Sequence, residues 1–334
     1  MLRLHPFRHH RPATLAEALA LLGEHAGDAM PIAGGTDLVP NMKHRLFTPG
    51  HIVSLKPLPE LRGIGVADGA LEIGAAESLA CLAKDPLVRR HAPALARAAS
   101  LVAGPQLRTM GTIGGNLCLD TRCTYYNQTE FWRQALGFCL KKDGDVCHVT
   151  KTGRKCVAAH SADTPPVLIA LDASVELASA AGVRRVPVAD LFVADGIWNS
   201  VRRPDEILTR VRVPLPAPGL RTAFEKLRQR NAIDFPLLNV AVAARIGDQE
   251  TVDSLVIVVS ALGSRPRVIS GLDRMAAGRP LDADLIEDAA ELAFQQCHPL
   301  TNLIVDPEWR RAMVPVHVRR ALGGIAAGGR TPAP

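Results

Sequence analysis

Apolar and polar positions follow two different spacings along this chain, and each spacing predicts a different element. Leu15, Leu19 and Leu22 recur at the spacing of one helix face. Thr14 and Glu17 form a capping box, in which a hydroxyl and a carboxylate each satisfy a backbone amide at the start of a helix. A helix is therefore predicted from about residue 14 to residue 22.

Short apolar runs predict strands in the first two thirds of the chain, and longer runs rich in Ala and Leu predict helices. The predicted strands are 30–33, 51–55, 71–73 and 175–177. The predicted helices are 86–103 and 164–171. This alternation predicts a mixed α/β region.

The last third of the chain begins after a proline cluster at 214–218, which is typical of a domain connection. It carries three strand-like runs followed by two amphipathic helices, which predicts antiparallel strands backed by helices, an α+β arrangement. The strands are 224–227, 238–246 and 255–260, and the helices are 283–297 and 309–322. The Gly-, Ala- and Pro-rich end, 324–334, is predicted to be a flexible tail.

The composition, 47% hydrophobic over 334 residues, is that of a globular chain with core enough for about two or three domains. No apolar run reaches the roughly 20 residues of a membrane span, and the basic first residues lack the apolar segment of an export signal. The net charge of +6 is spread thinly, with no basic stripe interleaved with aromatics. We expect a cytoplasmic protein with neither a membrane nor a nucleic acid partner.

Five of the seven cysteines lie between residues 118 and 156. In a chain without an export signal, such clustering indicates metal or redox chemistry more than a disulfide framework. Of the others, Cys81 and Cys297 are predicted to be core thiols. His5, His9 and His10 are dense in sequence but define no ligand geometry, so they are predicted to be surface residues.

Two glycine segments, 33–37 and 111–116, could cradle a pyrophosphate, because glycine lets several backbone amides approach a phosphate without a side chain in the way. Neither has the pattern of a P-loop or of the Gly-x-Gly-x-x-Gly dinucleotide fingerprint. Taken singly, either segment could equally be an ordinary tight turn.

Taken together, five segments resemble the FAD-binding medium subunits of the xanthine dehydrogenase and carbon monoxide dehydrogenase family. They are 31–38, 108–117, 161–172, 224–230 and 234–236. The resemblance implies an α+β protein with a vanillyl-alcohol-oxidase (PCMH)-type FAD-binding domain at 1–219, made of two α/β subdomains at about 1–57 and 58–219. A C-terminal α+β domain of antiparallel strands and helices would follow at 220–323.

By motif position, the resemblance implies that the two glycine segments bracket the FAD pyrophosphate. Their residues are Pro31, Ile32, Ala33, Gly34, Gly35, Thr36, Asp37, Leu38, Gly111, Thr112, Gly114, Gly115 and Asn116. It also implies that Asp120 and Asp163 hold sugar or ribityl hydroxyls. Lys226 would lie near the flavin ring, where a cation stabilises the reduced form. No constellation for acid-base or nucleophilic catalysis is apparent.

About forty residues, roughly 118–160, stand between two of these segments where the family normally has only a few. Cys123, Cys139, Cys147 and Cys156 within them could ligate either a 4Fe-4S cluster or a structural zinc ion, and their spacing does not decide between the two. The segment 121–128, together with the later cysteines, resembles the flavoprotein subunit of 4-hydroxybenzoyl-CoA reductases, and that resemblance implies the 4Fe-4S cluster. The aromatic residues of this insertion are predicted to form an apolar shell: Tyr125, Tyr126, Phe131, Trp132 and Phe138.

The resemblance further implies an electron-transfer subunit in a doubled heterotrimer with a small 2Fe-2S subunit and a large molybdenum-cofactor subunit. Electrons would pass from a ferredoxin-like donor through the 4Fe-4S cluster and FAD to the partner subunits, where an aromatic CoA thioester is reductively dehydroxylated. One alternative is an ordinary molybdenum hydroxylase subunit that delivers electrons to NAD or a quinone. A stand-alone flavin oxidase and a zinc-braced, non-redox scaffold remain as further alternatives.

Overall fold

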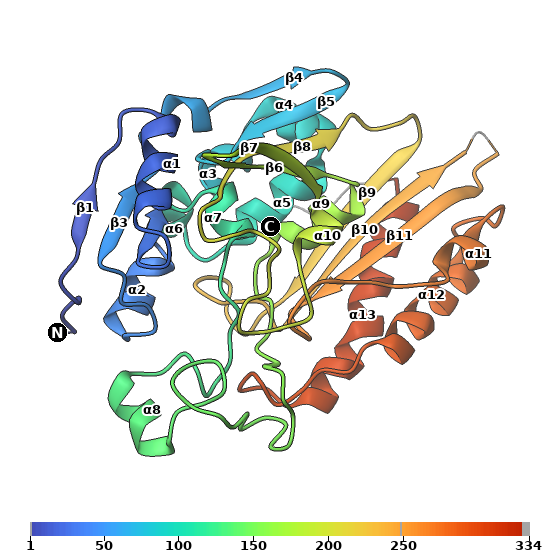
Figure 1. The fold of residues 1–334 in the computed structure, drawn as a ribbon. Helices are drawn as coiled ribbons and strands as arrows, with labels where there is room; N and C mark the ends of the chain where they lie inside the picture. Colours follow the sequence, from blue (N-terminus) through green and yellow to red (C-terminus); the bar gives the residue numbers. More distant parts are fainter. Residues whose placement is uncertain (1, 248, 329–334) are drawn as a thin grey trace.

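The computed structural model describes residues 2–247 and 249–328, which form three β-sheets with helices packed between and around them (Figure 1). The sheets follow one another in sequence, and Figure 1 shows them side by side from the N-terminal to the C-terminal part of the chain. The mixture of helices with mainly antiparallel sheets confirms the α+β prediction.

The first sheet is parallel, with strand order β1-β3-β2. Its elements are β1 (Arg8–His10), α1 (Leu15–Glu24), β2 (Ala29–Ile32), α2 (Leu38–Lys43) and β3 (His51–Ser54). The capping box predicted the first helix correctly: the Glu17 amide donates to Thr14 Oγ1 at 3.2 Å, and the Glu17 carboxylate accepts from the Ala13 amide at 2.7 Å. Ala18 and Leu22 of α1 are buried in a small core with Val53.

The second sheet is antiparallel, with strand order β4-β5-β8-β6-β7. Its strands are β4 (Ile64–Ala67), β5 (Ala70–Gly74), β6 (Ser174–Ser179), β7 (Gly182–Pro187) and β8 (Ile207–Pro214). Its helices are η1 (Pro59–Leu61), α3 (Leu79–Leu82), α4 (Pro86–His91), α5 (Pro93–Leu101), α6 (Pro105–Met110), α7 (Ile113–Leu117), α8 (Glu130–Leu136), α9 (Thr164–Ala170) and α10 (Val188–Leu191). The sequence pattern missed β4, β7 and β8.

The third sheet is antiparallel, with strand order β12-β11-β10-β9. Its elements are β9 (Leu220–Leu227), β10 (Leu238–Ile246), β11 (Val252–Ser260), β12 (Arg267–Val268), α11 (Leu272–Ala276), α12 (Ala283–Gln296) and α13 (Pro307–Ala326). Side chains of β10 enter two cores: Ala241 packs with the helices of the second sheet, and Val240 packs with α12 and α13. Burial on both faces explains why this strand is apolar almost throughout.

Two sequence-based boundaries are wrong. The predicted helix 86–103 is two helices, α4 and α5, because Pro93 cannot donate a backbone hydrogen bond and Ala92 adopts a non-helical conformation (φ −143°, ψ 60°). Residues 324–326, predicted to belong to a flexible tail, are the last turn of α13, and Ile325 is buried. The rest of that predicted tail includes 329–334, which lie outside the described residues.

Within the described residues, no helix combines the length and the apolar character needed to cross a membrane.

Candidate functional site

A cavity of about 450 Å³ opens where the first sheet, the second sheet and the start of the third meet. All thirteen predicted residues of the two glycine segments line it, together with Asp120 and Asp163. Lys226 does not line it but lies directly behind Asp163. The fold therefore gathers one cavity from segments that are separated by more than a hundred residues in sequence.

The two glycine segments are in direct contact, and only glycine fits at the contact point. A Cβ atom on Gly34 would overlap the backbone carbonyl of Met110 and lie 2.9 Å from the amide nitrogen of Gly111. Gly35 has a φ of +70°, a conformation that favours glycine. A Cβ atom on Gly114 would lie 2.8 Å from the Cβ of Ala75. The glycines thus bring two backbone segments together on one wall of the cavity.

The backbone amides of Gly34, Gly35 and Thr36 find no acceptor within the part of the chain that the structure describes. All three residues are half-buried and line the cavity, so their amides are open to a group bound there. Three consecutive donors on the wall of a cavity suit an anionic group, and a dinucleotide pyrophosphate is such a group.

In the second segment, by contrast, the side chains are engaged in local structure. Thr112 caps α7, and its hydroxyl accepts from the Gly115 amide at 3.1 Å. The Asn116 side-chain oxygen accepts from the amide (3.1 Å) and the hydroxyl (2.7 Å) of Thr164, which joins α7 to α9. The segment predicted as a second glycine turn is therefore a capped helical turn.

Asp120 lies at the edge of the cavity and leaves one oxygen without a protein partner. Its Oδ1 atom accepts from Lys141 Nζ at 2.6 Å, whereas Oδ2 is buried and has no hydrogen-bond partner among the described residues. An orphaned buried acceptor is rare in proteins and suggests a missing donor. A sugar or ribityl hydroxyl is a donor of the required kind.

Asp163 and Lys226 form a buried ion pair, with 2.7 Å between Oδ2 and Nζ. Asn239 Nδ2 donates to the other carboxylate oxygen at 3.1 Å, and Lys226 also donates to the Leu101 carbonyl at 3.1 Å. Burial raises the pKa of the Asp163 carboxyl, and the neighbouring Lys226 charge opposes that effect. The pair fixes a positive and a negative group at the back of the cavity.

The sequence analysis missed part of the cavity wall, namely residues 197–200, Arg202 and residues 233–235. It also missed Arg122, whose guanidinium pairs with Asp37 of the first glycine segment and stacks on the Phe235 ring 4.3 Å from its centre. Burial lowers the pKa of Arg122 to about 10. Residues 234 and 235 belong to a segment on which the family resemblance rests, but that segment did not assign them to the site. The other residues meet only through tertiary contacts.

The four cysteines predicted as metal ligands come together and are all buried. Cys123, Cys139, Cys147 and Cys156 line a second, smaller cavity of about 20 Å³ with Tyr125, Tyr126, Lys141 and His148. Burial raises the pKa of the Cys123 thiol to about 11, so its thiolate form needs a nearby positive charge. Within the described residues, no three of the four sulfur atoms lie within 4.8 Å of one another.

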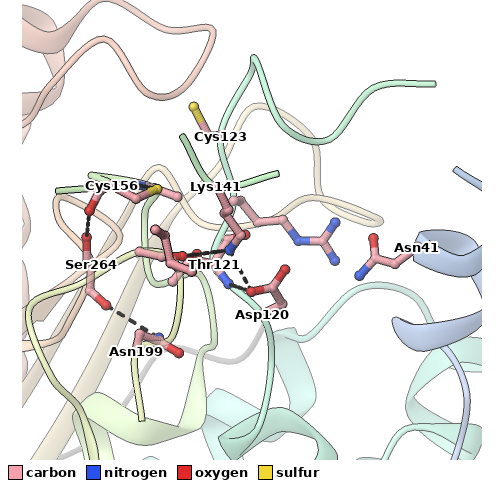
Figure 2. Close-up of polar contacts among 12 residues, drawn as sticks. Asn41, Asp120, Thr121, Cys123, Lys141, Cys156, Asn199 and Ser264 are labelled. Carbon is pink, nitrogen blue, oxygen red and sulfur yellow. Dashed lines mark hydrogen bonds and ion pairs between the residues drawn. The ribbon is translucent and has the colours of Figure 1, made fainter. Parts of the chain in front are cut away.

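Backbone and side-chain contacts join the cysteine cavity to the larger cavity (Figure 2). The Cys156 carbonyl accepts from the Gly196 amide at 2.9 Å and from Ser264 Oγ at 3.3 Å, and the Ser264 carbonyl accepts from Asn199 Nδ2 at 3.4 Å. Asn199 lines the larger cavity. Figure 2 also shows Lys141 reaching from the cysteine loop to Asp120.

The predicted aromatic shell of the cysteine loop is only partly right. Tyr126 is buried, but Phe131 is 82% exposed and Trp132 is 40% exposed. Helix α8, which carries both, lies at the outer end of the loop (Figure 1). It is anchored instead by the buried Arg133, whose guanidinium donates to the carbonyls of His44 (2.9 Å) and Arg45 (3.2 Å).

Comparison with known proteins assigns the family. Residues 5–216 match the family described as "FAD binding domain in molybdopterin dehydrogenase", and residues 222–325 match "CO dehydrogenase flavoprotein C-terminal domain". The chain belongs to the FAD-binding subunits of the xanthine and carbon monoxide dehydrogenase family. It is therefore a flavoprotein subunit of the molybdenum hydroxylase type, and the predicted FAD-binding fold is confirmed.

Individual relatives resemble this flavoprotein over almost their whole length. It is 30% identical over 322 residues to the carbon monoxide dehydrogenase medium chain of Hydrogenophaga pseudoflava, covering 96% of this chain and 97% of that protein. It is 29% identical over 326 residues to a putative xanthine dehydrogenase FAD-binding subunit of Escherichia coli, with the same coverage. A solved structure of the Hydrogenophaga enzyme superposes with a TM-score of 0.79 at 29% identity, covering 99% of this chain and 100% of that chain.

One buried histidine of the flavoprotein predicts a dependence of stability on pH. His160, where the cysteine loop ends, is 1% exposed, and neither ring nitrogen has a partner among the described residues. Burial lowers its pKa to about 3, against about 6.5 in an unfolded chain. As the pH falls below 6.5, His160 becomes protonated in the unfolded state but stays neutral in the folded state. The free energy of unfolding therefore decreases from its value at pH 7.

His160 should lower the free energy of unfolding of the wild type by about 2 kcal/mol when the pH falls from 7 to 5. Urea denaturation at both pH values should show a correspondingly smaller loss in His160→Leu. His9→Leu, at an exposed position, is the control and should behave as the wild type does. Equal losses in His160→Leu and the wild type would show that His160 does not remain neutral.

Proposed function

We propose that this flavoprotein is the electron-transfer subunit of a complex resembling 4-hydroxybenzoyl-CoA reductase, with a 4Fe-4S cluster held by Cys123, Cys139, Cys147 and Cys156. Electrons from a ferredoxin-like donor enter through the cysteine loop and leave from the flavin toward 2Fe-2S and molybdenum centres on partner subunits. There, two electrons and two protons replace an aryl hydroxyl group by hydrogen and release water.

The observation that carries the proposal is that the fold brings four buried thiols together around one small cavity. In a 4Fe-4S cluster each thiolate binds a different iron atom. Four thiolates around one cavity suit a 4Fe-4S cluster, and the contacts between the cysteine loop and the larger cavity support a cluster over a redox-inert zinc ion.

The contacts between the two cavities support a relay. Cys156 is joined to the wall of the larger cavity through Gly196 and through Ser264 and Asn199. Arg122, which pairs by its backbone with Ala159 across the base of the loop, reaches Asp37 in the first glycine segment. A redox centre in the loop would thus stand next to the flavin rather than at a remote surface.

The residues of the larger cavity fit FAD. The amides of Gly34, Gly35 and Thr36 would hold the pyrophosphate, and Asp120 Oδ2 would accept from a sugar or ribityl hydroxyl. Asp163 would stand beside the bound cofactor with Lys226 behind it, where the Lys226 charge offsets that of the Asp163 carboxylate. When bound, FAD supplies the transfer of electrons in ones or twos.

The names of the relatives support the proposed partners. Two of them are named medium chains of carbon monoxide dehydrogenase, which implies a larger and a smaller chain in those enzymes. We extend this composition to the present flavoprotein: a large molybdenum-cofactor subunit, a small 2Fe-2S subunit and a ferredoxin-like donor. The free thiols suit a reducing compartment, the cytoplasm.

A second candidate is an ordinary molybdenum hydroxylase subunit that passes electrons outward to NAD or a quinone. The names of the relatives favour it, since they include carbon monoxide, xanthine and nicotinate dehydrogenases. In that case the cysteine loop would hold zinc or a cluster that exchanges no electrons.

The deciding experiment is anaerobic purification of the native complex, with iron, acid-labile sulfide, zinc and FAD measured on the isolated flavoprotein subunit. About four irons and four sulfides with one FAD per chain support the relay. One zinc ion with one FAD and no iron would refute the cluster and favour the second candidate. The direction of flow is then read from whether reduced ferredoxin bleaches the flavin absorbance in the anaerobic complex.

A further inference from the structure

Three histidines from separate segments of the N-terminal sheet meet on one side of it, away from both cavities. His10 ends β1, His51 begins β3, and His25 follows the last turn of α1. The two strands are parallel, with Arg8 opposite His51 and His10 opposite Val53. His10 and His51 therefore point to the same face of the sheet as the buried Val53, which is the face that α1 covers.

The three rings are close enough to share one ligand. One nitrogen from each lies within 4.8 Å of the other two, and His10 Nε2 is 2.9 Å from His51 Nδ1. The ring centres of His25 and His51 are only 3.6 Å apart. A zinc ion with Zn–N bonds of about 2.0–2.1 Å holds its imidazole nitrogens about 3.3 Å apart, so the rings would turn toward the ion as it binds.

The surroundings leave the imidazoles available as ligands. All three rings are partly buried. Among the described residues, the side-chain hydrogen bond that these rings make is the one between His10 Nε2 and His51 Nδ1. Asp28 adds one negative charge nearby, and its carboxylate is fixed by the Gly50 amide at 2.7 Å. Arg8 adds one positive charge, so the charges of Asp28 and Arg8 nearly cancel beside the three histidines.

We propose that His10, His25 and His51 form a binding site for a divalent transition metal ion, with zinc as the physiological occupant and water completing its coordination. Three imidazoles with one open position are a ligand set that suits zinc, and cobalt binds to the same set. The site includes no residue of the flavin cavity or of the cysteine loop, so its test is independent of the function proposed above.

The consequence of metal binding is structural. β1 is three residues long, lies at the edge of the sheet and pairs only with β3. A metal ion bound by all three histidines would link this edge strand to the end of α1 and to β3. The prediction that His10 is a surface residue is wrong, because the chain folds it, half-buried, against His25 and His51, which lie 15 and more residues away.

The test is a titration of the full-length flavoprotein, with its FAD and without a polyhistidine tag, with Co²⁺ at pH 7.5. We expect one equivalent to bind with weak visible bands and without the intense near-ultraviolet band of cobalt-thiolate bonds, and Zn²⁺ to displace it. His51→Gln and His25→Gln should each weaken binding at least tenfold. His9→Gln, an exposed neighbour on the same strand, should leave it unchanged within twofold.

An FAD content of about one per chain shows that a variant has folded. If one of the two variants does not fold, the other still tests the site. Wild-type binding in both His51→Gln and His25→Gln would overturn the proposal. So would cobalt that shows only thiolate bands, because the ion would then reside in the cysteine loop.

Discussion

Cys139→Ser is expected to reduce the iron content of the flavoprotein from about four atoms per chain to less than one, while FAD stays at one per chain. Each of the four buried thiols would supply one corner of the cluster, and serine is a poor ligand for iron. The glycine segments line the flavin cavity and not the cysteine cavity, so their geometry should survive. The measurement is iron, sulfide and FAD on the anaerobically purified complex.

The matched control is Cys81→Ser. Cys81 was predicted to be a core thiol, but it is exposed on α3, far in sequence from the loop, and its loss should leave iron unchanged. If Cys139→Ser retains its iron, the cysteine ligands are misassigned. If it loses FAD as well, the two cavities are not independent, and the contacts through Cys156 and Arg122 must hold the flavin site in shape.

The parts of this fold that depend on neighbours in sequence were predictable, because their physical causes are local. Thr14 and Glu17 set the start of α1, and the mainly apolar run 238–246 gave the bounds of β10 correctly. The glycine segments were located because a motif identifies residues close together in the chain. Even there, Thr112 turned out to cap a helix, a role that its sequence allows but does not require.

The parts that were missed depend on contacts between distant segments. Phe131 and Trp132 were expected to line a core, but the position of α8 is set by Arg133 through the carbonyls of His44 and Arg45, nearly ninety residues earlier. Likewise, no local pattern places His25 beside His10 and His51. Residue type predicts what a side chain can do, whereas packing decides whether it is exposed to do it.

Gly34→Val is expected to weaken FAD binding at least about 100-fold, so that the purified protein is nearly colourless in the flavin bands. The new Cβ would overlap the Met110 carbonyl and approach the Gly111 amide, and both are backbone atoms that cannot rotate away. Relief requires the two glycine segments to separate, and overpacking of this kind costs about 1–3 kcal/mol or more. The separation would also move the unpaired amides of Gly34, Gly35 and Thr36 away from the pyrophosphate. FAD content and the affinity of the apoprotein for added FAD are the measurements.

The iron content of Gly34→Val shows whether the substitution has disrupted the flavin site alone or the whole fold. The cysteine cavity shares no lining residue with the first glycine segment, so Gly34→Val should keep its cluster while losing FAD, the converse of Cys139→Ser. Gly65→Ala is the control, because a Cβ atom at that position in β4 meets no atom within 4 Å. Normal FAD affinity in Gly34→Val would mean that the pyrophosphate does not lie on this segment. Loss of both cofactors would mean that the contact between the glycine segments holds the whole domain together, rather than the flavin alone.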